Sequence, residues 1–282
     1  MAHQIETHGH QAAALYARTD PWHRLGTTVA GEAFTAEDAM TLGHLGGWTV
    51  RKVALSATEV TADGVTTMDV PGFATVRTNP FTAAPEALGV VGAGYTPLQN
   101  EEHAQFLNHL ADASGATFDT AGSLRGGRQV FVTMRLPQHL TIGGTDRVDL
   151  NIAALNSHDG TSAFRVLVTP VRVVCANTQH AALRDHVSSW SIRHTRNAKA
   201  AAQAARDSLG PTLAPGPRSS AASPRLWSTN WCAQGSVRAQ PAQAVFRDAN
   251  GMTTAPVGAA REPEARWVSS QAPNFAAVVG RR

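Results

Sequence analysis

Three short turn signals, each between two segments of alternating polarity, constrain the fold of this chain most strongly. They are Asp63-Gly64, Gly126-Gly127 and Asp159-Gly160. Pairs of this composition accept the positive φ angles that tight hairpin turns need, and apolar residues at every second position indicate half-buried strands. The sequence therefore predicts antiparallel hairpins. The clearest strand is 129–136, where one face holds Val130, Val132, Met134 and Leu136.

Helical segments separate these hairpins. Thr35 and Asn100 are residue types that cap helix N-termini, and two acidic residues follow each of them within the first turn. After Asn100, helical spacing places four side chains on one face: His103, Phe106, Leu107 and Leu110. A third helix is expected to begin at a cap formed by Asn177 and to run to about His186. These elements predict an α+β fold, in which antiparallel β-hairpins form a curved sheet packed by a few helices.

The basic character of the chain is concentrated in its last quarter. Residues 1–209 hold 16 Lys and Arg against 18 Asp and Glu, a net charge of −2, whereas residues 210–282 hold 8 Arg against 3 acids, a net of +5. The second segment also has 8 of the 15 prolines and neither Lys nor His. We therefore predict an α+β domain over 1–209 and a tail over 210–282. Two explanations of the tail stay open: a disordered basic segment, and out-of-frame translation of a GC-rich gene.

Nothing in the composition indicates a membrane or an oxidising compartment. No apolar run approaches the roughly 20 residues that span a bilayer, and the N-terminus lacks the basic and apolar regions of a secretory signal. Two cysteines in 282 residues are too few for a disulfide scaffold. We expect a soluble, cytoplasmic protein with no membrane partner.

Within the body, positive charge gathers late. Residues 1–160 carry 9 cations and 16 anions, a net of −7, whereas 161–209 carry 7 cations and 2 anions, a net of +5. A local excess of arginine is the electrostatic signature of phosphate binding. Together with the 125–128 hairpin, this gives the predicted nucleic-acid contacts: Arg125, Arg128, Arg165, Arg172, Arg184, Arg193, Arg196 and Lys199. The alternative is an ordinary solvated face whose cations pair with Asp159 and Asp185.

Aromatic side chains could stack on single-stranded bases. The candidates are Tyr95, Phe131, Phe164 and Trp190, each of which fits a core position as well. Trp22, bracketed by Pro21 and Gly26 in "PWHRLG", is expected instead to anchor a turn.

Three residues could carry catalysis. His158 and Asp159 are neighbours of the kind that act as an acid/base pair, and Cys175 precedes a predicted helix that could lower its pKa. Each has a structural explanation as well: Asp159-Gly160 suffices as a turn, and Cys175 shares a strand face with Val171 and Val173. No ligand or phosphate-binding motif of known spacing is present, so no metal or other cofactor is expected.

Five segments resemble a family of phage/plasmid-like proteins built on a domain of unknown function and common in actinobacterial phages, plasmids and prophages. They are "PWHRLG", "LGVVGAGYTPLQNEEH", "TAGSLRGGRQVFVTMRLP", "ALNSHDGTSAFRVLVTPVRVVCANT" and "RHTRNA". The resemblance covers roughly residues 16–209. It implies a mobile genetic element but no defined reaction. The hairpins that lead into a helix also resemble, in architecture alone, phage single-strand annealing recombinases.

The leading hypothesis is a nucleic-acid-associated protein, such as a single-stranded-DNA-binding or strand-annealing factor in phage or plasmid replication and recombination. One alternative is a hydrolase that uses His158, Asp159 or Cys175. A second alternative is a structural module that assembles into homo-oligomers.

Overall fold

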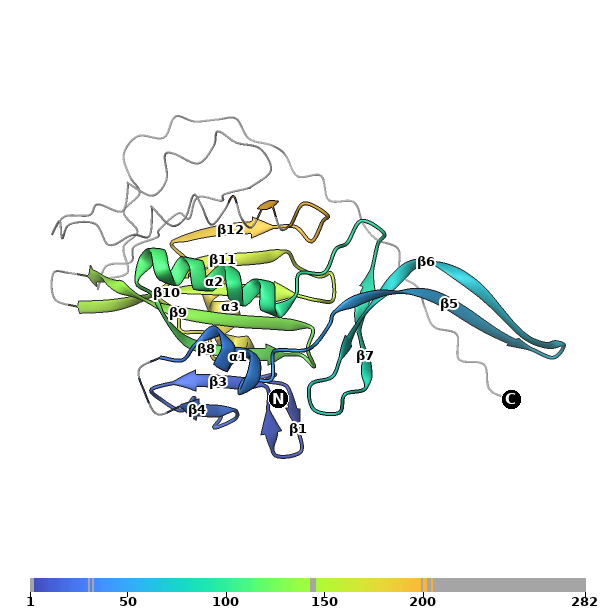
Figure 1. Ribbon diagram of the computed structural model, residues 1–282, viewed down its shortest axis with the longest axis horizontal. Coiled ribbons are helices and arrows are strands. Elements are labelled where there is room, and N and C mark those ends of the chain that lie inside the picture. The colour runs from blue at the N-terminus through green and yellow to red at the C-terminus, as the bar shows by residue number, and fades with distance from the viewer. Residues whose placement is uncertain are drawn as a thin grey trace, which may run out of the picture. The chain divides into compact units, whose positions relative to one another are not determined.

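The computed structural model describes residues 3–29, 31, 33–142, 146–198, 200, 201 and 204. These residues form a mixed α+β fold, which confirms the predicted class (Figure 1). The predicted tail, 210–282, and Lys199 lie outside the described residues.

A seven-stranded sheet is the centre of the fold, in the order β12-β11-β10-β9-β8-β3-β4. Its neighbours pair antiparallel except for β3 and β4, which are parallel. The strands are β3 (Ala14–Ala17), β4 (Thr27–Val29), β8 (Thr117–Leu124), β9 (Gln129–Ile142), β10 (Asp146–Ser157), β11 (Phe164–Thr169) and β12 (Ser188–Ile192). Two of the predicted turns, Gly126-Gly127 and Asp159-Gly160, connect β8 to β9 and β10 to β11.

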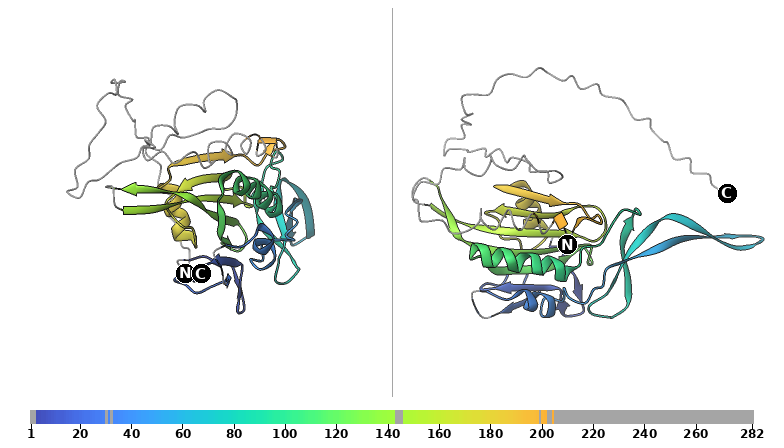
Figure 2. Two further views of the ribbon diagram at one scale, coloured as in Figure 1. Left: turned by 60° about the vertical axis from the view of Figure 1, so that its left-hand side comes forward. Right: turned by 45° about the horizontal axis from the view of Figure 1, so that its top comes forward.

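Two smaller sheets accompany it. One pairs β1 (Thr7–His8) with β2 (Gln11–Ala12). The other has three strands: β5 (Arg51–Thr61), β6 (Gly64–Thr78) and β7 (Pro85–Val91). The third predicted turn, Asp63-Gly64, joins β5 to β6. Beyond the part of β6 that pairs with β7, this hairpin extends away from the central sheet as a two-stranded ribbon (Figures 1 and 2). We call residues 53–72 the arm.

Two helices, α1 (Ala36–Thr41) and α2 (Asn100–Ser114), cover one face of the sheet. The predicted Thr35 cap is confirmed, because its hydroxyl accepts a hydrogen bond from the Asp38 N–H at 3.1 Å. The predicted Asn100 cap is wrong by one residue, since the cap position is Gln99. The Asn100 side chain is buried instead, and its amide donates to the Leu45 carbonyl at 2.8 Å.

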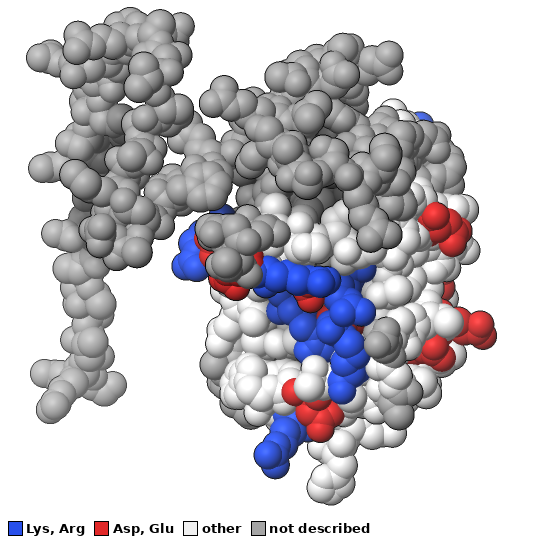
Figure 3. Space-filling model, turned by 90° about the vertical axis from the view of Figure 1, so that its left-hand side faces the viewer, with Lys and Arg blue, Asp and Glu red and all other residues white. Residues whose placement is uncertain are grey.

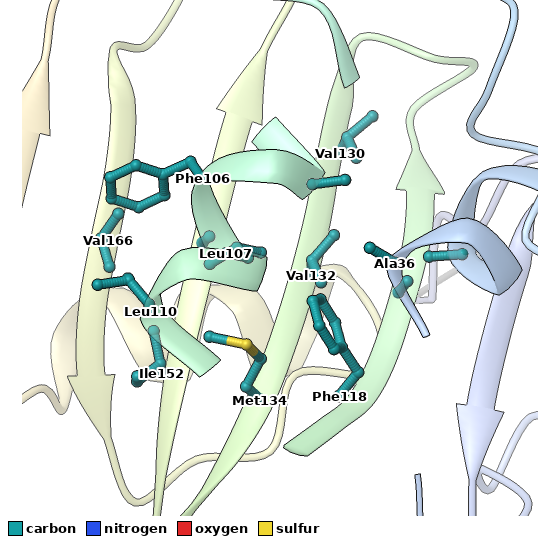
Figure 4. Packing of buried hydrophobic residues seen from close by; sticks show 14 of the residues in the cluster. Ala36, Phe106, Leu107, Leu110, Phe118, Val130, Val132, Met134, Ile152 and Val166 are labelled. Carbon is teal, nitrogen blue, oxygen red and sulfur yellow. The ribbon is translucent and has the colours of Figure 1, made fainter. Parts of the chain in front are cut away.

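The larger core lies between α2 and the sheet. Figure 4 shows α2 residues pointing at the strands below them. The four residues predicted to share the inner face of this helix are all buried: His103, Phe106, Leu107 and Leu110. The predicted inner face of β9 is confirmed as well, because its four apolar side chains join the same cluster: Val130, Val132, Met134 and Leu136.

The opposite face of the sheet is covered by α3 (Ala176–Arg184) and by the segment that leads to it. The expected strand through Val171, Val173 and Cys175 is wrong. After β11 the chain crosses the sheet, and side chains hold its carbonyls: the Thr120 hydroxyl donates to Val173 at 2.5 Å, and the Tyr16 hydroxyl to Val174 at 3.1 Å. We call residues 170–175 the strap.

The third helix starts two residues before the expected position. Cys175 occupies the cap position and Asn177 is an exposed residue of the first turn, so the predicted Asn177 cap is wrong. The Thr178 hydroxyl accepts hydrogen bonds from the N–H groups of Val174 and Cys175, at 2.8 and 3.0 Å. These bonds satisfy strap donors that have no strand partner, and so allow the helix to begin early.

A buried ion network fixes the base of the arm. Arg77 of β6 has no exposed surface, and its guanidinium donates to the carboxylates of Glu6 and Glu86 and lies 4.2 Å from the Trp48 ring centroid. Gly127 closes over it with φ +79°, and a Cβ built there would overlap the guanidinium. The network therefore joins the N-terminal segment, the arm and the β8–β9 hairpin.

The two glycines of this hairpin provide a matched test. Gly126 also has a positive φ, +62°, but nothing lies within 4 Å of a Cβ built there. We expect Gly126→Ala to lower the free energy of unfolding by about 1 kcal/mol, the cost of the left-handed conformation. Gly127→Ala should lower it by about 3 kcal/mol or more, because it also displaces a buried charge from its partners. Urea unfolding of both variants measures the difference; equal effects would show that the Arg77 contact does not stabilise the fold.

Candidate nucleic-acid interface

Four arginines line a hollow at the end of the sheet where β3 and β11 finish. The hollow has a volume of about 480 Å³, and Figure 3 shows Lys and Arg side chains gathered on this face. Its lining residues come from β9, β10, the end of β3 and the strap: Arg18, Thr19, Arg135, Arg147, Asp149, Asn151, Pro170 and Arg172. We call it the basic hollow.

A buried carboxylate holds two of these arginines. Asp119, near the start of β8, has 1% of its surface exposed. Its Oδ2 accepts from the Arg172 Nε at 2.7 Å, and its Oδ1 lies 2.9 Å from an Arg18 guanidinium nitrogen. Arg172 also donates to the Ala17 carbonyl at 2.9 Å. One carboxylate thus fixes two guanidinium groups, and a positive charge remains.

The other two arginines are less constrained. The Arg135 side chain is half-buried on β9. In the part of the chain that the structure describes, this side chain has no hydrogen-bond or ion-pair partner. Arg147 on β10 lies 3.5 Å from Asp149, and both side chains are exposed. With Asp119, the hollow holds four arginines and two aspartates, a net charge of +2. Such a surface attracts anions, and planar guanidinium groups match the paired oxygens of phosphate.

A second, smaller cationic pocket lies at the other end of the same face. It has a volume of about 70 Å³ and includes Arg125, Gln129, Arg165 and His180 among its lining residues. Arg125 Nε donates to the Gln4 side chain at 2.7 Å, and an Arg125 terminal nitrogen lies 3.1 Å from His180 Nε2. We call it the hairpin-end pocket. Gln129 and Arg135 are six residues apart on β9, so about 20 Å separates the two sites.

The structure does not gather the predicted nucleic-acid contacts on one surface. Arg172 lies in the basic hollow, whereas Arg125 and Arg165 line the hairpin-end pocket, with Arg128 exposed in the adjacent turn. The rest are dispersed or undescribed: Arg184 bonds Asp185 on the surface, Arg193 and Arg196 are exposed after β12, and Lys199 lies outside the described residues.

Sequence reasoning missed three of the four arginines in the basic hollow. Arg18, Arg135 and Arg147 belong to a segment, 1–160, whose net charge of −7 hides them. Arg172 pairs with Asp119, 53 positions away. Of the two aspartates in the solvated-face alternative, Asp185 pairs with Arg184. One signal was present: Arg135 alternates on the same strand face as Phe131 and Thr133. The arginine's position at the end of that face depends on the tertiary fold.

The structure buries most of the aromatic rings that were candidates for stacking on bases. Three of the four predicted rings are buried in the core, namely Phe131, Phe164 and Trp190, and the Tyr95 hydroxyl donates to the Ser157 carbonyl. Trp22, expected to anchor a turn, is 65% exposed.

This exposed ring lies beside the strap. The Trp22 ring centroid is 6.5 Å from that of His3 and 5.3 Å from that of His23. His23 Nε2 is 3.1 Å from the Val174 carbonyl of the strap. Trp22 is not among the lining residues of the basic hollow.

The three candidate catalytic residues do not meet. His158 and Cys175 have no exposed surface, and they lie on opposite faces of the sheet. His158 Nε2 is 2.8 Å from the Asn100 side-chain oxygen. Asp159 instead accepts hydrogen bonds from Ser157 and Thr161, and although burial raises its pKa, these bonds hold it below the usual value. This geometry gives no support to the hydrolase alternative.

Two kinds of feature are absent from the described residues. No cluster of three or more His, Cys, Asp or Glu side chains there could hold a metal ion. None of the helices among those residues has both the length and the apolar character needed to cross a membrane.

The fold and these surfaces define an α+β protein with a cationic hollow at one end of its central sheet. The chain belongs to the family described as Domain of unknown function (DUF932), which matches residues 87–274. The match begins in β7 and continues beyond residue 209, into the predicted tail. It confirms the expected membership of a domain-of-unknown-function family. Neither the curated proteins nor the solved structures contain a match to this chain.

Buried histidines generate a pH prediction. Burial lowers the pKa of His103 and of His158 to about 3 each. Between pH 6.5 and 3 the unfolded chain therefore binds more protons than the folded one. The free energy of unfolding should fall as the pH falls, by up to about 1.4 kcal/mol per pH unit for each histidine.

The variant His103→Leu should reduce this slope, because it removes one of the two groups that bind a proton more readily in the unfolded chain. Leucine can replace the ring, whose nitrogens have no hydrogen-bond partner among the described residues. His109→Leu, at an exposed position of the same helix, is the control and should leave the slope unchanged. Urea unfolding at pH 7.5 and pH 5 provides the comparison. An unchanged slope in His103→Leu would mean that His103 is not a neutral buried group.

Proposed function

We propose that this protein binds single-stranded nucleic acid through the basic hollow, as a factor encoded by a phage, plasmid or prophage. The observation that carries the proposal is the arginine cluster around buried Asp119. The exposed ring of Trp22, whose neighbour His23 contacts the strap, offers a surface on which a base can stack. The mobile-element origin rests on the sequence resemblance alone.

Fixed charge supports phosphate as the ligand. Arg18 and Arg172 are held in place by Asp119 before any ligand arrives, so less side-chain entropy is lost on binding. Arg135 and Arg147 add two side chains that can reorganise around a backbone. A chain of phosphates bound by several arginines releases counterions, and its affinity falls steeply with salt.

The exposed ring of Trp22 favours a single strand over a duplex. Bases in a single strand have free faces that can stack on an aromatic ring, and each stack contributes about 1–3 kcal/mol. The bases of a duplex are already stacked on one another and leave Trp22 without such a partner. In this proposal the hollow binds phosphates of the strand, and a base of the same strand stacks on the indole of Trp22.

Arg125, Arg128 and Arg165 stay predicted contacts of a second site. The hairpin-end pocket lies on the same face of the sheet, about 20 Å from the hollow along β9. A strand of several nucleotides is long enough to reach both positions.

The charge contribution can be tested with the double substitution Arg135→Ala and Arg147→Ala. Both side chains lack a buried partner, so the fold should be preserved. We expect weaker binding of single-stranded DNA, and a plot of log affinity against log salt that is shallower by about 1 for each phosphate no longer neutralised. Fluorescence anisotropy at several salt concentrations measures both. Arg51→Ala, an exposed arginine far from the hollow in sequence, is the control. Wild-type protein that binds no DNA at low salt would refute the proposal.

The stacking contribution requires a separate variant. Trp22→Ala should weaken binding of single-stranded DNA by about 5- to 150-fold, the equivalent of 1–3 kcal/mol, and Trp22→Phe should recover part of the affinity. Any weak duplex binding should be unaffected. Tryptophan fluorescence quenching by oligonucleotides gives an independent measurement. Equal weakening for single and double strands would show that Trp22 does not stack on bases.

A further inference from the structure

The arm is exposed along most of its length. Half of the large apolar side chains that are exposed in this part of the chain belong to it: Val53, Val60, Val65, Met68 and Val70. Val60 and Val65 are paired across the two strands next to the tip, with 75% and 68% of their surfaces exposed. Val60 and Val65 lie on one face of the ribbon, and Met68 and Val70 lie on the other. Exposed apolar side chains gathered on one element indicate a contact surface.

Both edges of the arm also lack a neighbouring strand. β7 pairs with β6 only from Phe73 to Thr78, and β5 forms the other edge of this sheet. A two-stranded ribbon is marginally stable in water by itself, and its free backbone groups are available to a partner. The arm therefore has the features of an element that is completed by binding.

The net charge of the arm limits the kind of surface that it can bind. Residues 53–72 contain Glu59, Asp63 and Asp69 and no Lys or Arg, a net charge of −3. This surface repels a phosphate backbone. It also disfavours symmetrical pairing of two arms, which would bring six carboxylates together.

A complementary surface is present on the protein itself. The basic hollow has a net charge of +2 and lies at the end of β9 away from the base of the arm. The base is fixed near the 125–128 turn, where Gly127 packs on Arg77. The arm and the hollow thus lie at opposite ends of the central sheet, so an arm cannot reach its own hollow (Figures 1 and 3).

We propose that the arm of one copy binds in the basic hollow of a second copy. The acidic side chains of the arm, with Asp63 at its tip, would face Arg135 and Arg147, which have no buried carboxylate partner. Because the two surfaces differ, the contact is head-to-tail, and repetition gives a closed ring or an open filament. Arm and nucleic acid are then alternative occupants of one hollow.

Complementary variants test this geometry. Asp63→Lys damages the arm and leaves the hollow intact; the double substitution Arg135→Ala and Arg147→Ala damages the hollow and leaves the arm intact. In sedimentation velocity at low salt, the wild type should form species larger than a dimer, which dissociate as salt is added. Each variant alone should be monomeric, with self-association weakened at least about tenfold. An equimolar mixture should form a heterodimer and nothing larger, because one intact arm and one intact hollow remain.

Three results would overturn the proposal: a monomeric wild type at low salt, self-association that survives in both variants, or a mixture that stays monomeric. Asp69→Lys is a second arm variant in case Asp63→Lys disturbs the turn. The double substitution Arg193→Ala and Arg196→Ala, the same truncation at exposed positions after β12, is the control and should assemble normally.

This inference and the proposed function fail separately. The arm variants keep all four arginines of the hollow, so DNA binding can persist when self-association is abolished. The Trp22 variants keep the arm and the hollow, so assembly can persist when stacking is abolished.

Discussion

The carboxylate of Asp119 is the interaction on which the candidate site depends. It binds Arg18 at the end of β3 and Arg172 in the strap, two residues from distant parts of the chain. The strap crosses from β11 to β8 without ladder hydrogen bonds, so this ion pair and a few side-chain bonds hold it against the sheet. Because one buried anion is shared by two cations, the pairing that stabilises the strap also leaves positive charge at the surface.

A second buried ion cluster fixes the other end of the molecule's described part. Arg77 joins Glu6 and Glu86 below the arm and packs against Gly127. In both clusters, ion pairs of arginine with carboxylates join distant segments at one end of the sheet. The net charge of the two ends differs in sign. The Asp119 end presents net positive charge, while the Arg77 end supports an arm with net negative charge. The central sheet therefore separates two complementary surfaces, and this separation underlies the proposed head-to-tail contact.

Local signals predicted the elements of the fold well. The three turn pairs join strands as expected, Thr35 caps a helix, and the inner faces of α2 and β9 are buried. Errors occurred where a tertiary contact was stronger than a local preference. Asn100 and Asn177 are good cap residues. The Asn100 side chain forms a buried hydrogen bond to Leu45 instead. The Thr178 hydroxyl accepts from a strap N–H group, so the third helix begins before Asn177.

Turn chemistry and side-chain periodicity act over a few residues, so the α+β class, the hairpins and the apolar faces could be predicted from the chain alone. Arg172 was also recognisable there as a charge that packing does not explain. Which charges meet depends on the tertiary fold: Arg18, Arg135, Arg147 and Arg172 come from four separate segments, three of them in a stretch that is acidic as a whole. Coulombic interactions depend on distances in space, and the pairing of distant strands sets those distances. For the same reason, net charge along the chain could not locate the basic hollow.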